Sequence, residues 1–188
     1  AVVSGDGFLR LFSVTGKLMW RALAHSDTVY AVRFSPDGTM IASAGDDGTI
    51  KLHTRQGDKI RTLRVHSDGV TDLAFSSDGR QLVSASKDET VRIWTVSGEL
   101  LHTLLGHEGD VMGVAISPDG KTIASASDDE TVILWSTEGK ALRRWKDHRD
   151  DVETVAFSPD GRFLASGGWD RRVYLSNLQT RSEEHTSE

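Results

Sequence analysis

Cysteine is absent from this chain of 188 residues, which excludes a disulfide framework and a thiolate metal site. The absence of cysteine also fits a reducing compartment, so we expect a cytoplasmic protein. Excess positive charge is lacking as well. The net charge is −6 at pH 7, which argues against nucleic acid or an anionic membrane as the main partner.

Long apolar stretches and helical periodicity are missing too. No apolar stretch is long enough to span a bilayer, and no signal peptide is present. Because residue 1 lies inside a repeat, any signal ahead of it would be missing from this sequence. Clusters of Asp, Gly and Ser interrupt the chain too often for a helical period to persist, so we expect an all-β fold.

What the sequence does contain is one skeleton of polar and apolar residues that returns after 41 positions. The skeleton is clearest from His66 to Trp94 and returns from His107 to Trp135. Further copies start at His25 and His148. A unit of this size cannot bury a core alone, so neighbouring copies must stack on one another.

Each full copy contains four strand-like runs, which in the third copy are residues 111–117, 122–127, 131–136 and 141–145. An Asp-Gly pair marks a hairpin between the first two runs, because Gly adopts positive φ without steric cost. These pairs are Asp37-Gly38, Asp78-Gly79, Asp119-Gly120 and Asp160-Gly161.

A His, a Ser, an Asp and sometimes a Trp recur at constant offsets. A Ser nucleophile with a His base and an orienting Asp would make a hydrolase. A hydrolase needs one such set, whereas here the set returns in every copy, so we expect a structural hydrogen-bond chain instead. Its members are His25, Ser43, Asp47, His66, Ser84, Asp88, Trp94, His107, Ser125, Asp129, Trp135, His148, Ser166 and Asp170.

This skeleton resembles the WD-repeat β-propeller family, in which each unit of about 40–45 residues supplies one four-stranded blade. The resemblance covers residues 1–180, with departures. The Gly-His pair of the family is intact only at Gly106-His107. Phe12, His53 and Ser176 stand at three of the Trp positions, so we expect a weaker hydrogen-bond chain in the units that hold His53 and Ser176.

The resemblance implies blades of four antiparallel strands in an open arc of about five blades, three complete and two partial, from a larger ring of about seven. The two partial blades cannot merge, because both contain the second and third strands. We also expect apolar faces to be exposed at both ends of the arc. The predicted units are 1–24 (partial), 25–65, 66–106, 107–147 and 148–180 (partial).

The last residues, 181–188, do not continue the repeat. They match the in-frame translation of a common sequencing-library adapter, so we expect a non-native tail. A natural disordered tail is the alternative.

In this family, partner contacts lie on one rim, three and five residues after the His and one before the Asp. Here these positions differ from copy to copy and carry several carboxylates against one Lys, which favours a basic partner segment. Three large side chains are candidate anchors, although Trp169 could instead pack on its own blade. The positions are Thr28, Tyr30, Asp46, Gly69, Thr71, Lys87, Asp110, Met112, Asp128, Asp151, Glu153 and Trp169.

No unique nucleophile, phosphate-binding loop or non-repeating metal-ligand cluster is present, so we expect no enzyme activity, cofactor or metal. Asp46-Asp47 and Asp128-Asp129 could suggest a hard cation, but the second Asp of each pair belongs to the skeleton.

We therefore predict a scaffold that binds a protein or peptide. The alternative is the sensor region of a larger multidomain signalling protein, such as a kinase or signalling ATPase, which the neighbouring gene sequence would reveal. A hydrolase is the remote alternative, and Ser84→Ala would abolish its activity.

Overall fold

The computed structural model describes residues 1–64 and 66–179. The predicted tail at 181–188, together with Val65 and Thr180 at the ends of two predicted units, lies outside the described residues. The described chain contains strands and no helix, so no helix in it is long and apolar enough to cross a membrane. The prediction of an all-β fold is confirmed.

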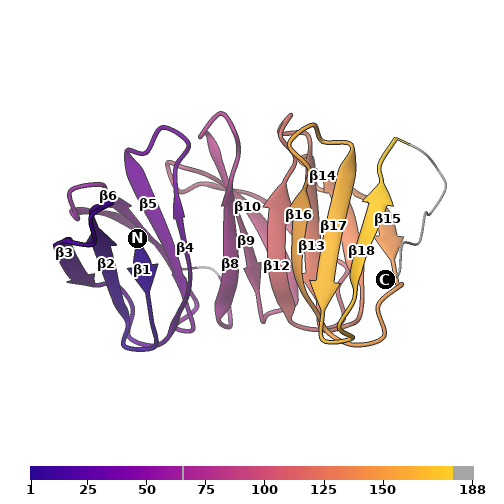
Figure 1. Cartoon of the computed structure of the whole chain (residues 1–188), viewed down its shortest axis with the longest axis horizontal. Coiled ribbons are helices and arrows are strands. Elements are labelled where there is room, and N and C mark those ends of the chain that lie inside the picture. The colour runs from indigo at the N-terminus through magenta and orange to yellow at the C-terminus, as the bar shows by residue number, and fades with distance from the viewer. Residues whose placement is uncertain (65, 180–188) are drawn as a thin grey trace.

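The strands form five antiparallel sheets, A to E, in which strands that follow one another in sequence are paired (Figure 1). Sheets B, C and D have four strands each, and sheets A and E have three. Sheet A contains β1 (Val2–Val3), β2 (Phe8–Phe12) and β3 (Leu18–Leu23); sheet B contains β4 (Val29–Phe34), β5 (Met40–Gly45), β6 (Thr49–Thr54) and β7 (Lys59–Arg64); sheet C contains β8 (Val70–Phe75), β9 (Gln81–Ser86), β10 (Thr90–Thr95) and β11 (Leu100–Leu105); sheet D contains β12 (Val111–Ile116), β13 (Thr122–Ser127), β14 (Val132–Ser136) and β15 (Ala141–Trp145); sheet E contains β16 (Val152–Phe157), β17 (Phe163–Gly168) and β18 (Val173–Asn177).

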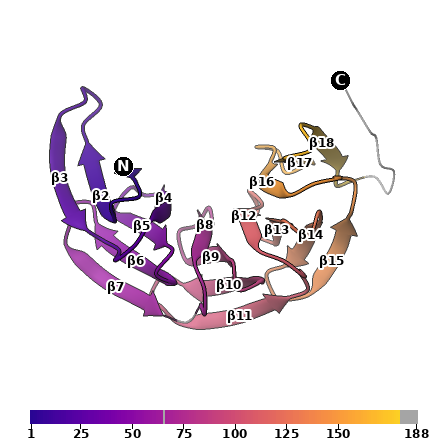
Figure 2. The same ribbon diagram turned by 90° about the horizontal axis from the view of Figure 1, so that it is seen from below.

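The five sheets stand side by side in an open arc, with the first strand of each sheet on the concave side and the last on the convex side (Figure 2). Figure 2 therefore matches the predicted arc of three complete and two partial blades. Successive side chains of a strand point to opposite faces, so a central sheet must be apolar on both. In β10, Trp94 packs towards sheet B and Ile93 packs towards sheet D.

The core lies between the sheets, because each pair of neighbours buries one apolar layer. Leu63 at the end of β7 packs in the layer that holds Trp94 of sheet C. Leu104 of β11 occupies the same place in the layer with Trp135 of sheet D. Burying such side chains stabilises the stack by roughly 1.5–3 kcal/mol each.

The Asp-Gly hairpins join the first two strands of sheets B to E. In the first of them Gly38 has a φ of 69°, which a residue with a Cβ adopts only at a cost. Asp37 accepts hydrogen bonds from the Ser35 hydroxyl and the Thr39 amide, which closes the turn. The predicted reason for Gly at this position is therefore confirmed.

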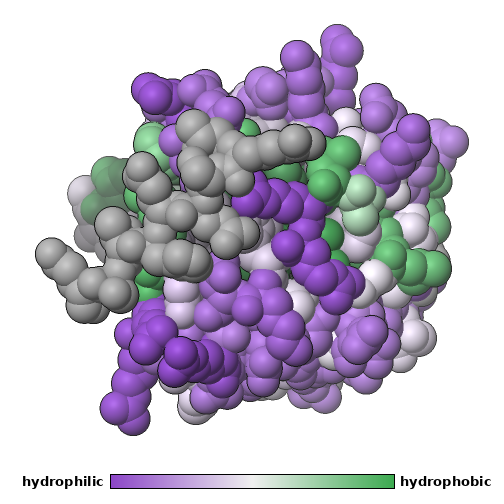
Figure 3. Space-filling view, turned by 90° about the vertical axis from the view of Figure 1, so that its right-hand side faces the viewer, coloured by the Kyte–Doolittle hydropathy of each residue, from purple (hydrophilic) through white to green (hydrophobic). Residues whose placement is uncertain are grey.

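Sheet E forms one end of the arc, and hydrophobic side chains remain visible there among hydrophilic ones (Figure 3). On β18, Val173 is 68% exposed and Leu175 is 44% exposed. In sheets B to D, the matching third strand is covered by a fourth. The expected exposure of apolar side chains is therefore observed at this end.

Candidate functional site

Sheets B to E each contain a chain of hydrogen bonds that starts at the His ahead of the first strand. In sheet C, His66 Nδ1 lies 2.9 Å from Asp88 Oδ2, and His66 Nε2 lies 2.7 Å from Ser84 Oγ. Trp94 donates its indole N–H to Ser84 Oγ over 2.9 Å. We call such a group a quartet; its contacts recur between His25, Asp47 and Ser43, between His107, Asp129, Ser125 and Trp135, and between His148, Asp170 and Ser166.

Protonation states follow from the surroundings of each group. Burial raises the pKa of Asp88, but hydrogen bonds from His66 and Thr90 outweigh it and hold the pKa below its usual value. Burial lowers the pKa of His66 against the opposing effect of Asp88, so the ring is neutral at pH 7. A carboxylate only accepts, so Nδ1 carries the proton, Nε2 accepts from Ser84, and Ser84 accepts from Trp94.

The Ser-His-Asp order of these contacts is that of a hydrolase, but the serine is out of reach. Ser43, Ser84 and Ser125 are each 0% exposed. In sheets C and D the serine oxygen already accepts an indole N–H. A nucleophile must meet its substrate, so this geometry supports a structural role in which buried donors and acceptors satisfy one another.

Sheet B has a His in place of the Trp. His53 is 3% exposed, and its Nδ1 atom has no hydrogen-bond partner among residues 1–64 and 66–179. Burial lowers the pKa of His53, with smaller contributions from the nearby His25 and Lys51. The hydrogen-bond chain of this sheet is thus shorter than in sheet C, as the sequence predicted.

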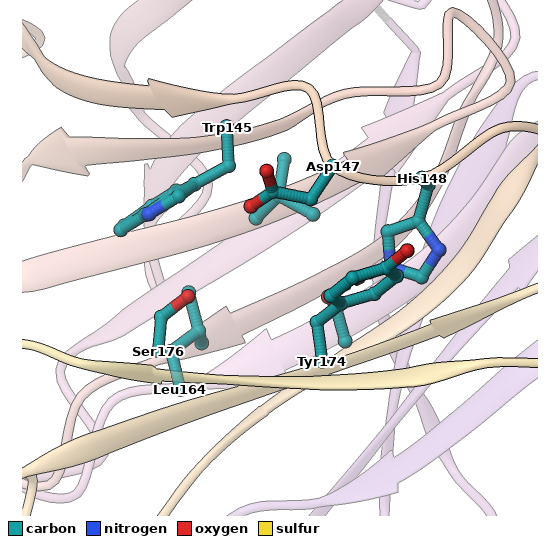
Figure 4. Close-up of a pocket in the computed structure, with 8 residues that line it drawn as sticks. Trp145, Asp147, His148, Leu164, Tyr174 and Ser176 are labelled. Atoms are coloured by element: carbon teal, nitrogen blue, oxygen red, sulfur yellow. Dashed lines mark hydrogen bonds between the residues drawn. The ribbon is translucent and has the colours of Figure 1, made fainter. Parts of the chain in front are cut away.

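Sheet E has Ser176 in place of the Trp, and other side chains line the space around it (Figure 4). The ring of Tyr174 meets the ring of His148 edge-on, with centroids 4.4 Å apart. Trp145 of β15 in sheet D lines the same space. It stands at the position that Leu63 has between sheets B and C and that Leu104 has between sheets C and D.

Between sheets C and D the Trp belongs to the third strand of the later sheet, whereas between sheets D and E it belongs to the last strand of the earlier sheet. Trp145 and Ser176 replace the Leu104 and Trp135 pair of the preceding layer. A cavity of about 10 Å³ remains between them, which is room for roughly one water molecule. The indole Nε1 of Trp145 is buried and has no hydrogen-bond partner in the described part of the chain.

The predicted partner-contact residues lie on one edge of the sheets, which we call the rim. It is the edge where β17 ends and β18 begins, at the bottom of Figure 1. In sheets B to E, the pairing of the first two strands shifts at one residue next to this edge. Such a bulge turns its side chain away from the regular pleat. The bulged residues are Tyr30, Thr71, Met112 and Glu153.

On the rim of sheets B and C, three predicted contact residues bind one another. Lys87 Nζ lies 2.9 Å from Tyr30 Oη and 3.0 Å from Asp46 Oδ1, and it sits 4.8 Å from the centre of the Tyr30 ring. Hydrogen bonds to Tyr30 and Asp46 raise the pKa of Lys87 above its usual value. The only Lys among the predicted contacts is thus neutralised by its own chain.

Three further positions in these two sheets are occupied by contacts within the chain. Thr71 is buried, and its hydroxyl donates to the Val111 carbonyl of sheet D over 2.5 Å. It is therefore a contact between sheets, in contrast to the surface position that we predicted. The Thr28 carbonyl accepts the Asp46 amide over 2.8 Å. Gly69 leaves space in which the Asp46 carboxylate packs.

On the rim of sheets D and E, the carboxylates of Asp110, Asp128 and Asp151 form what we call the acidic patch. Burial raises the pKa of Asp110. Burial, together with the negative charges of Asp110 and Asp151, raises the pKa of Asp128. None of the three forms an ion pair with a residue in the described part of the chain. Met112, at the bulge between Asp110 and the rest of β12, is half-buried.

Trp169 lies beside the acidic patch at the end of β17. Its side chain is 66% exposed, and its indole N–H donates to Glu153 Oε1 over 2.5 Å. Its amide donates to the Asp151 carbonyl over 2.8 Å. Trp169 therefore projects from its blade, in contrast to the alternative that it packs on it.

One ion pair between sheets was not predicted from the sequence. Arg33 of β4 pairs with Asp72 of β8 at 2.5 Å, and Asp72 also accepts the Val114 amide of sheet D over 3.2 Å. Burial raises the pKa of Asp72, opposed by Arg33. The available signal was a charged residue at a position that is Ala31 or Gly113 in neighbouring copies.

Across residues 1–64 and 66–179, no group of three or more His, Asp or Glu side chains is arranged to hold an ion. Asp47 and Asp129, the skeleton members of the two Asp-Asp pairs, bind their own His and Thr partners instead.

Comparison with curated proteins gives no match. A family model described as WD domain, G-beta repeat matches residues 16–54, 57–95, 98–136 and 139–176, which together make up most of the chain. Each match begins at the last strand of one sheet and ends at the third strand of the next, so a repeat ties two sheets together. The chain therefore belongs to the WD-repeat family, whose repeats generally mediate contacts between proteins and are typically non-catalytic.

Proposed function

We propose that this chain is a protein-binding scaffold whose acidic patch takes a basic segment of the partner. The observation that carries the proposal is that the carboxylates of Asp110, Asp128 and Asp151 lie on one rim without an ion pair to any residue that the structure describes. Carboxylates that repel one another are stabilised by a partner that brings the opposite charge.

The chain itself contains an example of the interaction that we propose. On the neighbouring part of the rim, the ammonium group of Lys87 is held by the Asp46 carboxylate and the Tyr30 ring. A carboxylate next to an aromatic face is a good environment for a cation. The acidic patch offers carboxylates, with Met112 and Trp169 close by. The charge of Lys87 acts on Asp110, but no cation of the described residues forms an ion pair with the three carboxylates.

The rim also has the variability that a specific binding surface needs. The His, Ser and Asp of the quartet return in sheets B to E, whereas Asp110 and Asp151 stand where the other copies have Thr28 and Gly69. The position of Asp128 is occupied by Asp46, Lys87 and Trp169 in the other copies. Surface residues that have no packing role can differ between copies, so they can determine which partner binds. The negative charge of this surface also attracts a basic partner before the two proteins come into contact.

A titration with a fluorescein-labelled Arg-Gly repeat peptide tests the proposal by fluorescence anisotropy. We expect Asp128→Lys to weaken binding by about tenfold or more, and affinity to fall as salt rises. Glu138→Lys is the matched control, since Glu138 is exposed in the turn at the opposite edge. Equal loss in both variants would show that only net charge matters and would refute the rim as the binding surface.

A further inference from the structure

A hollow of about 650 Å³ lies on the rim of sheet E, next to the acidic patch. Its lining includes Trp169, Glu153, Asp150 and Arg171. Gly167 and Gly168, the last two residues of β17, also line it. Trp169 is 66% exposed, so its indole ring is accessible to a ligand that enters the hollow.

The geometry points to this hollow as a recognition site for a single arginine side chain of the partner. The hydrogen bond from Trp169 Nε1 to Glu153 fixes the ring and places a negative charge at its edge. A negative charge there adds to the attraction of the ring face for a cation. The guanidinium group is planar and weakly hydrated, so it stacks on an indole better than an ammonium group does.

The charges around the hollow agree with this occupant. Glu153 and Asp150 belong to the lining, and Asp151 lies beside it, bonded through its carbonyl to the Trp169 amide. Arg171 is the one cationic side chain on the wall, and no cation–π contact joins it to Trp169 among the described residues. The inference deepens the proposed function, since it names the side chain that Trp169 would read.

The test uses the Trp169 indole N–H signal in ¹H–¹⁵N correlation spectra, assigned from its loss in Trp169→Phe. N-acetyl-arginine amide should shift this signal in a saturable way. N-acetyl-citrulline amide, which has the same shape without the charge, should shift it at least about fivefold less. No shift with arginine, or equal shifts with both probes, would overturn the inference.

Two variants sharpen the assignment while keeping the ring. Glu153→Gln should reduce the shift, because it removes the charge at the ring edge; an unchanged shift would contradict the role of Glu153. Arg171→Ala should increase the shift, because a like charge leaves the wall. A smaller shift in Arg171→Ala would mean that the hollow prefers an anion, and it would overturn the inference.

The same two probes distinguish a failure of the arginine site from a failure of the proposed function. In Asp128→Lys, the Arg-Gly repeat peptide should bind weakly while N-acetyl-arginine amide still shifts the Trp169 signal. If Asp128→Lys does not weaken peptide binding but arginine shifts the Trp169 signal, only the proposed function fails. If the peptide depends on Asp128 but the Trp169 signal stays fixed, only the arginine site fails.

Discussion

Asp128 and Asp129 are adjacent in the chain, yet their carboxyl groups belong to two regions with opposite properties. Burial raises the pKa of Asp129, but hydrogen bonds from Thr131 and the Glu108 amide and the His107 ring lower it to about 2. Burial and like charges instead raise the pKa of Asp128. The quartet satisfies its carboxylate within the fold, whereas the Asp128 carboxylate on the rim forms no ion pair with a described residue and is one that we propose for a basic partner.

The largest effect that separates the two regions should come from Trp94→Ala. Removing a fully buried Trp also removes the indole donor to Ser84, so we expect the free energy of unfolding to fall by about 3–5 kcal/mol. Hydrogen exchange of sheet C, followed by mass spectrometry, measures the loss locally. Trp169→Ala on the rim is the control and should change stability by no more than about 0.5 kcal/mol. Similar losses in both variants would erase the distinction.

The two adjacent aspartates offer the closest matched pair. Asp129→Ala leaves buried donors on His107 and Thr131 without their acceptor, which should cost about 1–3 kcal/mol in urea unfolding. Asp128→Ala removes like-charge repulsion and should leave stability within about 0.5 kcal/mol. A larger loss for Asp128→Ala than for Asp129→Ala would invert the comparison.

Changes in pH should act on the two regions with opposite sign. Burial lowers the pKa of His25 and of His53, so the folded state binds fewer protons than the unfolded state. Their stabilisation is complete above the unfolded pKa of about 6.5 and is lost as pH falls through the folded values, by up to about 1.4 kcal/mol per pH unit for each group.

The raised pKa of Asp128 works the other way. The folded state then binds more protons than the unfolded state, so Asp128 adds stability as pH falls through its raised folded pKa, and this gain is complete below the unfolded pKa of about 3.9. Urea unfolding at pH 7 and pH 5 tests the histidine effect. His53→Leu should lose less stability between these values than the parent chain does. A steeper loss in His53→Leu would contradict the assignment.

The smallest effect should come from restoring the missing donor in sheet B. His53→Trp places an indole N–H where Trp94 and Trp135 carry theirs, next to Ser43. A new buried hydrogen bond should add about 0.5–1.5 kcal/mol to the free energy of unfolding. Phe12→Trp, at the exposed matching position of sheet A, is the control and should gain nothing. A loss in His53→Trp would mean that sheet B has no room for the ring.

The fold was largely predictable because it depends on patterns that repeat. Constant spacing between the His, the Asp-Gly pair and the Trp indicated where the strands lie, and the predicted strands 122–127 and 141–145 match β13 and β15. A local pattern is enough here, since each strand pairs with its neighbour in sequence.

The contacts between sheets could not be derived in the same way. Lys87 with Tyr30, Arg33 with Asp72 and Trp145 with Ser176 each join side chains of different sheets. Such pairs depend on how two sheets are aligned, and each occurs once, so no recurrence reveals them. Thr71 shows the same limit, because a position that is exposed in one copy is buried under a neighbour in another.

One titration tests most directly whether the quartets stabilise the fold while the rim binds the partner. Indole N–H signals of Trp94, Trp135 and Trp169 are followed in ¹H–¹⁵N spectra while the Arg-Gly repeat peptide is added. We predict that the Trp169 signal shifts while those of Trp94 and Trp135, which are bonded to buried serines, stay in place. Shifts of Trp94 and Trp135 with a fixed Trp169 signal would contradict the account.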